Sequence, residues 1–384
     1  MTTPTGEAAA ALAQPRCSLH PAAAWPSPPD PTAARPPMSA TLIPAIAALD
    51  DPALQATLQQ ALDAKTKPLG ALGGLEALAL RIGLILGSAR PALRAPQLVV
   101  FAADHGLAAH GVSAYPPEVT WQMVENFLAG GAAVSVLARQ HGLALTVVDA
   151  GVRHDFAPRA GLQIRKIAAG TADASAGAAM TPAQCEAAIA AGRAVVRELP
   201  GNALLLGEMG IGNTSAAALL MSRLAGEPLA LCVGRGTGLD DDGLARKRER
   251  LQAVLQRHAD ATAPLAALAA FGGFEIAMLC GALLQAALER RVIVVDGFIV
   301  GAAALVAARL QPAVLQRCVW AHAGAEAGHA RLLTHLGAEP LLRLDLRLGE
   351  GSGAALAWPL LLSACHVLAE MASFEAAGVS RRAG

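Results

Sequence analysis

The sequence predicts an α/β protein whose doubly wound, mainly parallel sheet carries helices on both faces. Short, continuously apolar segments alternate with longer helical segments along most of the 384 residues, which is the pattern of a buried parallel sheet. Hydrophobic residues make up 54% of the chain but aromatic residues only 3%, so mainly Ala, Leu and Val must form the core. Several apolar segments also end in Asp, Glu or Gly, which is typical of strands that meet a ligand at their carboxyl ends.

Four segments have the length and the unbroken apolar character of buried strands: 97–103, 143–150, 202–208 and 291–297. Two further segments are weaker candidates, 318–323 and, weaker still, 229–234. Helices are predicted before and between them, at 42–61, 75–86, 118–140, 182–198, 214–224, 243–258, 274–290 and 301–310. The apolar run 292–308 invites a membrane interpretation, but it carries Asp296 near its middle and is short for a span. A strand that leads into a helix explains it better.

The charge balance and the cysteines indicate the class of partner and the compartment. Lys plus Arg (30) equals Asp plus Glu (30), so the chain lacks the basic surface of a nucleic-acid binder and a small-molecule partner is expected. Six cysteines without a CxxC pair indicate reduced thiols in a cytoplasmic protein. The N-terminus has no basic n-region and contains Glu7, which argues against a signal peptide. Residues 1–38, rich in Pro, Ala and Ser, are expected to be disordered.

The segment LLLGEMGIGNTSAAALL (204–220) carries a glycine turn between a predicted strand and a predicted helix. Asn213 or Thr214 is expected to cap that helix, and the free N–H groups at its start would bind an anion such as phosphate. The spacing is GxxGxGNT, so the motif is neither a Walker loop nor GxGxxG. The alternative is a well-capped structural turn.

A second glycine-rich segment, VGRGTGLDDDGLARKRERLQ (233–252), is followed by a helix that contains Lys247. A glycine loop with one lysine is again typical of phosphate binding. The alternative is that Arg246, Lys247, Arg248 and Arg250 form a solvated helix face.

Two groups of histidines raise the question of a metal. His105 and His110 follow the first strand, and His322, Glu326 and His329 are spaced as on one helical face. A metal needs three or four convergent ligands, and neither spacing provides them dependably. No metal is expected.

The segment RLGEGSGAALAWP (347–359) places Glu350 between Gly349 and Gly351. Glycine neighbours indicate a close approach of the backbone or an angle that other residues avoid, and a carboxylate there suits chemistry better than packing. The alternative is a surface turn that caps the helix expected to begin near Ala354. Asp296, near the end of the 291–297 strand, is expected only to orient backbone.

Taken together, these segments resemble the nicotinate-nucleotide:dimethylbenzimidazole phosphoribosyltransferase family, which makes the lower ligand of cobalamin. The resemblance runs from about Lys65 to the C-terminal region, through KPLGALGGLE, ADHG followed by GVSAYPPEVT, VVDAGV, GEMGIGNTSAAA, FGGFEIAMLCG, VVDGFIVGAAAL, HAGAEAGH and RLGEGSGAALAWPLL. It implies a homodimer with an α/β core at 96–345. A smaller helical subdomain would begin at 39–95, and the chain would return to it with 346–384, after the catalytic glutamate loop.

The resemblance implies transfer of phosphoribose from nicotinate mononucleotide to 5,6-dimethylbenzimidazole, which gives α-ribazole 5′-phosphate and nicotinate. Glu350 then looks like the general base that removes the second N–H proton of the acceptor. Gly349 and Gly351 leave room for the flat ring. Nicotinate bonded through its ring nitrogen is a cationic leaving group, so no metal, diphosphate or other cofactor is expected.

By the same resemblance, Glu208 lies beside the ribose or the base. The phosphoribosyl end would be held by Gly210, Gly212, Asn213 and Thr214, with Lys247 nearby. Gly324 stands at the phosphate-side turn, where some relatives carry serine. Tyr115 and Met123 stand where some relatives carry serine and glutamine, in the wall of the base pocket. The acceptor is therefore open among dimethylbenzimidazole, another benzimidazole, adenine and a phenol.

Three other functions stay open at the level of the sequence. They are a nucleosidase-like enzyme that passes phosphoribose to water, a non-catalytic nucleotide-binding module, and a membrane-associated partner in cobamide assembly. The binding module has no use for Glu350, and the transferase is the favoured interpretation.

Overall fold

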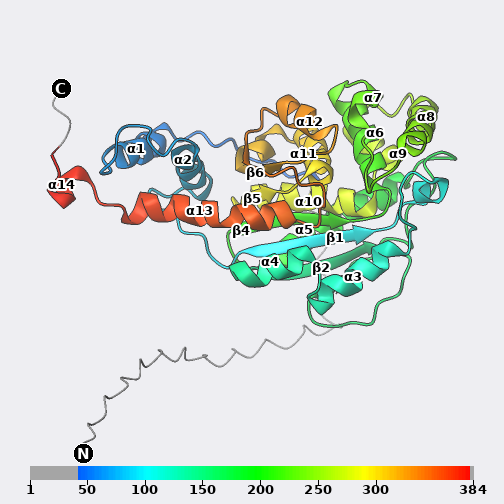
Figure 1. The fold of residues 1–384 in the computed structure, drawn as a ribbon, viewed down its shortest axis with the longest axis horizontal. Helices are drawn as coiled ribbons and strands as arrows, with labels where there is room; N and C mark the ends of the chain where they lie inside the picture. Colours follow the sequence, from blue (N-terminus) through cyan, green and yellow to red (C-terminus); the bar gives the residue numbers. More distant parts are fainter. Residues whose placement is uncertain (1–41, 381–384) are drawn as a thin grey trace, which may run out of the picture. The chain divides into compact units, whose positions relative to one another are not determined.

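Seven parallel strands form one sheet in the order β3-β2-β1-β4-β5-β6-β7 (Figure 1). The computed structural model describes residues 42–380, so the tail at 1–38 lies outside the described residues. The strands are β1 Gln97–Ala103, β2 Ala144–Gly151, β3 Leu162–Ile164, β4 Ala203–Met209, β5 Val292–Val295, β6 Cys318–Ala323 and β7 Pro340–Arg343. The order reverses between β1 and β4, and such a switch point opens a crevice at the carboxyl ends of the strands.

The predicted fold class and five of the six predicted strands are confirmed. The prediction of a strand at 229–234 is wrong, because the short helix α7 (Leu229–Cys232) occupies it. The edge strands β3 and β7 were not predicted. Their residues are half-buried or exposed, so they lack the unbroken apolar pattern of a central strand.

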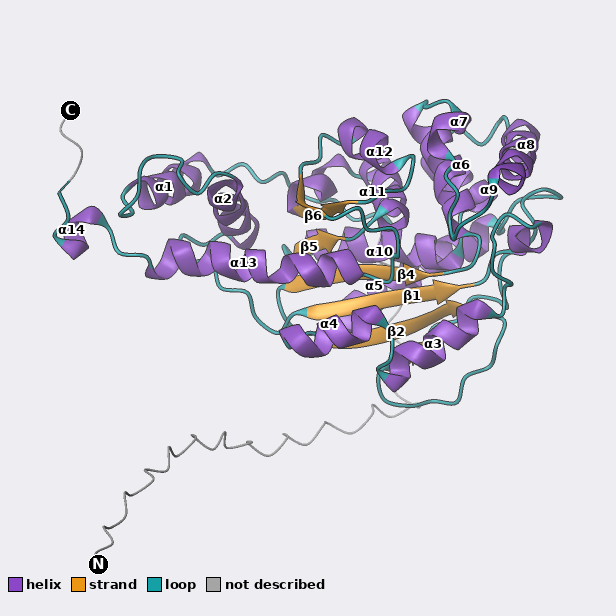
Figure 2. Cartoon of the chain, in the orientation of Figure 1, coloured by secondary structure: helices purple, strands orange, loops and turns teal. Residues whose placement is uncertain are grey.

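Side chains of the central strands alternate between two cores, one on each face of the sheet. In β1, Val99 and Phe101 belong to one core, whereas Leu98 and Val100 belong to the other. The first core is covered by α5 Pro182–Glu198, α6 Asn213–Ala225, α8 Asp241–Arg257, α9 Pro264–Phe271, α10 Phe274–Leu288, α11 Phe298–Leu310 and α12 His329–His335. The second is covered by α1 Pro52–Asp63, α2 Gly74–Leu86, α3 Val119–Ala129, α4 Ala133–His141 and α13 Ser352–Glu370 (Figure 2). Two 3-10 turns, Gly106–His110 and Pro312–Arg317, and the short α14 (Phe374–Ala377) complete the described elements.

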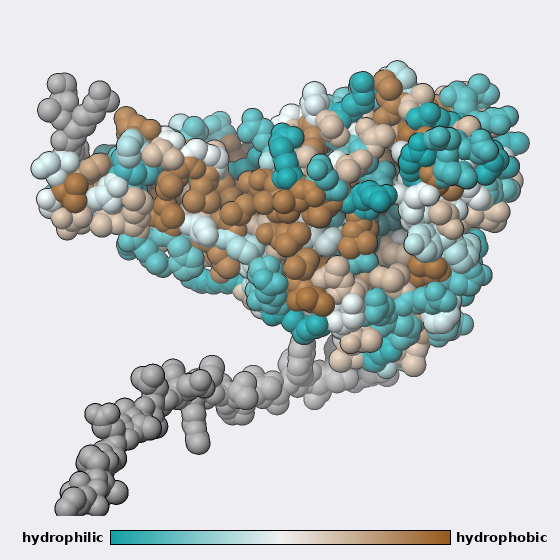
Figure 3. All heavy atoms as spheres, in the orientation of Figure 1, coloured by the Kyte–Doolittle hydropathy of each residue, from teal (hydrophilic) through white to brown (hydrophobic). Residues whose placement is uncertain are grey.

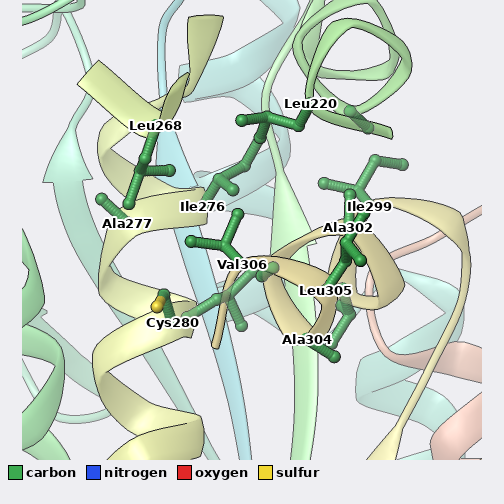
Figure 4. Close-up of a cluster of buried hydrophobic side chains, with 14 of the residues drawn as sticks. Leu220, Leu268, Ile276, Ala277, Cys280, Ile299, Ala302, Ala304, Leu305 and Val306 are labelled. Atoms are coloured by element: carbon green, nitrogen blue, oxygen red, sulfur yellow. The ribbon is translucent and has the colours of Figure 1, made fainter. Parts of the chain in front are cut away.

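Small aliphatic residues allow the helices of the first core to lie close to the sheet and to one another. Figure 4 shows side chains of α10 and α11, among them Ile276, Cys280 and Val306, gathered in one apolar cluster. The predicted Ala- and Leu-rich core is therefore confirmed.

Two predicted helices differ from the observed ones for local reasons. The helix predicted at 42–61 begins only at Pro52, where Asp51 accepts a hydrogen bond from the Leu54 N–H at 2.9 Å; an Asp cap followed by Pro is a strong start signal. The helix predicted at 118–140 is two helices, α3 and α4. They separate at Gly130, whose φ of +82° ends α3.

Within residues 42–380, α13 is the one helix long and apolar enough to cross a membrane by length and composition. Of its most apolar window, 56% is buried inside the protein, against the sheet and the neighbouring helices of the second core. The core helix of a globular protein has the same composition.

Helices α5 and α10 cross at two glycines that bring backbone against backbone. A Cβ atom on Gly281 would lie 2.0 Å from the carbonyl oxygen of Ile189, and one on Gly192 would lie 1.9 Å from that of Met278. Neither backbone carbonyl can move without moving its helix. The crossing therefore requires glycine at both positions.

We expect Gly281→Ala to lower the free energy of unfolding by about 3 kcal/mol, because overpacking in a dense core costs about that much. Chemical denaturation monitored by circular dichroism measures the change. Gly177→Ala is the matched control, since no atom lies within 4 Å of its added Cβ. Equal stability of the two variants would contradict the proposed backbone contact.

Candidate active site

A pocket, here called the main pocket, lies at the carboxyl ends of β4, β5 and β6. Its lining includes six residues that the family resemblance assigns to substrate binding: Glu208, Gly210, Asn213, Thr214, Gly324 and Gly349. Met209, Thr237, Phe298, His322, Glu326 and Arg347 also contribute. The pocket therefore lies beside the switch point of the sheet, where open α/β folds bind ligands.

The loop that carries Glu350 crosses directly over β4. Gly349, Glu350 and Gly351 have φ angles of +84°, +67° and +91°, so the chain makes a left-handed turn that only glycine adopts freely. A Cβ on Gly207 would lie 2.2 Å from the carbonyl oxygen of Glu350, and one on Gly349 would lie 2.4 Å from Oε1 of Glu208. Glycine is required on both sides of Glu350 because the loop lies against the strand and turns in a left-handed conformation there.

Asp296 fixes the end of this loop at the start of α13. Its carboxylate accepts hydrogen bonds from the N–H groups of Gly351, at 3.2 Å, and Ala354, at 2.8 Å. Burial raises the pKa of Asp296 to about 7, against the opposing effect of these backbone hydrogen bonds. The expectation that Asp296 orients backbone agrees with this geometry.

The carboxylate of Glu350 turns away from its own helix. Helix α13 has Gly351 as its N-cap and no side-chain cap, so the interpretation of Glu350 as a cap of that helix is wrong. Instead, the Val134 N–H in the first turn of α4 donates a hydrogen bond to Glu350. Glu350 is 5% exposed, and its Oε2 atom has no hydrogen-bond partner among the described residues. Burial, with a smaller contribution from Asp296, raises the pKa of Glu350 to about 7.

Glu208 is a second buried carboxylate, at the end of β4 and in the wall of the main pocket. The Asn213 side-chain amide donates a short hydrogen bond to it. Burial raises its pKa to about 8, and neighbouring carboxylates, including Asp296 and Glu350, add to the rise. Burial therefore favours the protonated form of both carboxyls, and the pKa of Glu208 is raised further than that of Glu350.

Helix α6 begins at the floor of the main pocket without a side-chain cap. Its N-cap is Gly212, with a φ of +97°, so the prediction that Asn213 or Thr214 caps the helix is wrong. The Asn213 side chain binds Glu208 instead, and the hydroxyl of Thr214 accepts a hydrogen bond from Lys247. Asn213 and Thr214, in the first turn of this helix, line the pocket, and helix starts of this kind bind phosphate in other proteins. The N–H groups of Asn213 and Ser215 donate to the carbonyl oxygens of Gly210 and Gly212.

Lys247 does not belong to a solvated helix face. It is 1% exposed, and its Nζ lies 3.0 Å from Oγ1 of Thr214. Gly236 covers it, since a Cβ there would lie 3.4 Å from Nζ. Burial lowers the pKa of Lys247 to about 8, although Glu326 opposes the change.

Of the three remaining predicted site residues, only Gly324 lines the main pocket. Gly324 lines the main pocket and donates its N–H to Nδ1 of His329 at 2.9 Å; a Cβ there would lie 2.9 Å from that nitrogen. Tyr115, 54% exposed, and Met123, half-buried on α3, do not line the main pocket. Met123 shares an apolar cluster with Met209, which does line it.

The histidines are paired within the protein rather than gathered around a metal. His105 lies 2.6 Å from Glu275, and His110 lies 2.6 Å from Asp173. His322 and His329 meet edge to face, with ring centroids 5.7 Å apart. Among residues 42–380, no three or more His, Cys, Asp and Glu side chains form a group that could hold a metal ion.

Several residues of the site were not predicted from the sequence. Arg347 lies three positions before Glu350, and Thr237 lies within the glycine loop 233–238. Both could have been identified as candidate site residues from these neighbouring motifs. Phe298 and Val134 carried no signal, because they resemble any other buried apolar residue of a helix.

Comparison with known proteins agrees with this geometry. A family model described as phosphoribosyltransferase matches residues 47–379. The chain is 74% identical over 340 residues to a nicotinate-nucleotide–dimethylbenzimidazole phosphoribosyltransferase of Variovorax paradoxus, covering 88% of this chain and 97% of that one. It is 63% identical to the enzyme of the same name from Cupriavidus necator, covering 88% and 98%. A solved structure of a nicotinate-nucleotide–dimethylbenzimidazole phosphoribosyltransferase from Thermus thermophilus superimposes with a TM-score of 0.83 at 43% identity, covering 87% of this chain and 100% of that one. The chain belongs to the phosphoribosyltransferase family that this model describes.

Proposed function

We propose that the protein transfers phosphoribose from nicotinate mononucleotide to a nitrogen of 5,6-dimethylbenzimidazole or a related base. The products are α-ribazole 5′-phosphate and nicotinate, and the step belongs to assembly of the nucleotide loop of cobalamin. The names of the relatives support this reaction. The observation that carries it is a buried glutamate, Glu350, with an unpartnered oxygen beside a pocket that has a phosphate-type helix start.

The phosphate is proposed to bind at the start of α6. Gly210, Gly212, Asn213 and Thr214 form that turn, and Lys247 approaches it through its hydrogen bond to Thr214. A dianionic phosphate would favour the charged form of Lys247, whose pKa is lowered to about 8 without a ligand. Gly324 lines the same pocket and contributes backbone in place of a hydroxyl.

The acceptor base is proposed to lie on the Met209 side of the pocket, toward α3. Met209 lines the main pocket and packs against the second core, as Met123 does. Thr120 of α3 accepts a hydrogen bond from the Ile211 N–H at 3.1 Å, which ties that helix to the turn after β4. From the family resemblance, Met123 and Tyr115 are proposed as the positions at which the choice among benzimidazoles, adenine and phenols is made, although neither lines the main pocket.

Glu350 is the proposed general base. As one nitrogen of the acceptor bonds to the anomeric carbon, the other must lose its proton, and an unpartnered carboxylate oxygen can accept it. The start of α4 favours the charged form of Glu350, and its pKa of about 7 matches a base that works near neutral pH. Glu208 is the competing candidate because it lines the pocket, but its pKa is raised to about 8 and Asn213 already donates a hydrogen bond to it, so less of its carboxylate is free to accept a proton near neutral pH.

We expect Glu350→Gln to lower kcat by about 100-fold or more with little change in KM, because the amide cannot accept the proton. The measurement is chromatography of α-ribazole 5′-phosphate formed from nicotinate mononucleotide and dimethylbenzimidazole. Glu208→Gln is the matched control and should lose less. The opposite ranking would assign the base role to Glu208. Ribose 5-phosphate that forms without any acceptor would support a nucleosidase instead.

The rate should rise with pH and level off above about 7, because only ionised Glu350 can accept a proton. The pKa of Glu350 is raised on folding, so its contribution to stability is present below its unfolded pKa and is lost as the pH rises through about 7. Glu350→Gln should therefore melt at a higher temperature than wild type at pH 8, and the difference should shrink toward pH 5. A pH-rate profile and thermal melts measure both effects. A flat profile between pH 5 and 9 would contradict the assignment.

We propose that the enzyme is a homodimer that uses the outer face of α13. Leu356, Leu360 and Val367 recur at helical spacing on that helix and remain half-buried, and Figure 3 shows apolar residues gathered over this part of the surface. A monomer seldom leaves so extended an apolar face to water.

Light scattering behind size exclusion should give twice the chain mass for the wild type. Leu360→Glu should shift the equilibrium to the monomer, because a charge would be buried in the interface. Leu288→Glu, which alters an exposed leucine on α10, should remain a dimer. A monomeric wild type at micromolar concentration would refute the proposal.

We also propose a cytoplasmic location. The five cysteines within the described residues are free and buried, as expected where thiols stay reduced.

A further inference from the structure

A second pocket adjoins the main pocket on the side of α8. We call it the arginine pocket, because Arg235, Arg248 and Arg347 contribute to its lining. Gly236, Glu326 and Arg347 line both pockets. The two pockets therefore meet along these three residues, and one ligand can extend into both.

The three guanidinium groups differ in the hydrogen bonds and ion pairs that they already make within the protein. Arg235 pairs with Asp241, and Arg248 donates only a long hydrogen bond, 3.4 Å, to the Ala230 carbonyl oxygen. Within residues 42–380, the Arg347 guanidinium has no hydrogen bond or ion pair. It does lie near Glu326: burial raises the pKa of the Glu326 carboxyl, and the positive charges of Lys247 and Arg347 oppose that rise. Asp241 and Glu326 offset two of the three charges, so one positive charge is left over.

Arg347 is held at the rim by the same segment that carries Glu350. The Ala325 N–H donates to the carbonyl oxygen of Leu346 at 2.8 Å, which fixes the chain just before Arg347. The contact of Gly349 with Glu208 fixes the chain just after it. The position of Arg347 is thus tied to the position of the proposed base.

The donor substrate has two anionic groups, and this step rests on the proposed function. The proposed function places its phosphate at the start of α6, beside Thr214 and Lys247. The carboxylate on the nicotinate ring lies on the other side of the ribose and needs a cation of its own. A planar guanidinium matches a carboxylate through two parallel hydrogen bonds.

We propose that the arginine pocket, with Arg347 as the principal contact, binds the carboxylate of the departing nicotinate and so selects nicotinate mononucleotide over nicotinamide mononucleotide. The two donors share the phosphate, the ribose and the cationic ring. They differ in one negative charge, which the leftover positive charge of the pocket matches.

The test compares kcat/KM for the two donors, with dimethylbenzimidazole as acceptor, in the wild type and in Arg347→Ala. We expect a loss of about 10- to 100-fold with the nicotinate donor, which is the usual range for a hydrogen bond to a charged group, and little change with the nicotinamide donor. Arg347→Lys should recover part of the loss. Arg250→Ala is the matched control, since it removes an exposed arginine of α8 that lines neither pocket. Inhibition by free nicotinate and by free nicotinamide gives the same comparison where turnover of the nicotinamide donor is too slow to measure.

The outcomes separate the hypotheses. Equal losses with both donors would place Arg347 on the shared phosphate and overturn the proposal. No loss with either donor would overturn it as well. A wild type that makes no product from nicotinate mononucleotide would refute the proposed function instead. Melting temperatures show whether Arg347→Ala is folded, and the nicotinamide donor serves as the internal reference within each variant.

Discussion

The site depends on one contact, the close approach of the Glu350 backbone to Gly207 in the central strand β4. Because Gly207 has no side chain, the loop can rest on the strand. Asp296 then holds the far end of the loop through the N–H groups of Gly351 and Ala354. The left-handed angle of Glu350 costs on the order of 1 kcal/mol, and a strained non-glycine residue at such a place is typical of a functional site. The sheet thus fixes the position of a loop that carries both Arg347 and Glu350.

The same contact concentrates carboxylates that the fold would be more stable without. Glu208, Asp296 and Glu350 are all buried, and burial is the main cause of the raised pKa of each. Their environments still differ: Asn213 binds Glu208, two backbone N–H groups bind Asp296, and the start of α4 binds Glu350. These differences leave the pKa of Glu208 higher than those of Asp296 and Glu350. Stability is exchanged for reactivity here, as is common in active sites.

Much of the fold could be predicted from the sequence because central strands and amphipathic helices have strong local patterns. The strands that surround the switch point are continuous apolar runs, and α5 and α8 carry clear periodicity. The edge strands could not be predicted in this way, because their half-buried and exposed residues lack an unbroken apolar pattern. The break at Gly130 is a local glycine signal that the continuous helical pattern around it concealed. The segment 229–234 was misassigned as a strand because a short apolar run does not distinguish a strand from a buried helical turn.

The candidate site was predictable where glycines surround a polar residue, as at Glu350, and less so elsewhere. The sequence indicates that the glycines matter, but not that Gly207 is the reason. It also does not show that Lys247 is buried or that Val134 supplies a hydrogen bond to the proposed base. Those facts arise from packing between different elements of the fold, as where Lys247 of α8 meets Thr214 of α6, and local patterns carry no information on such packing.

The most direct test of Glu350 as the general base is a crystal structure of the enzyme with dimethylbenzimidazole and nicotinate bound together. This assignment predicts an oxygen of Glu350 within hydrogen-bond distance of a ring nitrogen of the benzimidazole, with the loop still resting on Gly207. A complex in which Glu350 stays on Val134 alone and Glu208 contacts that nitrogen would contradict it.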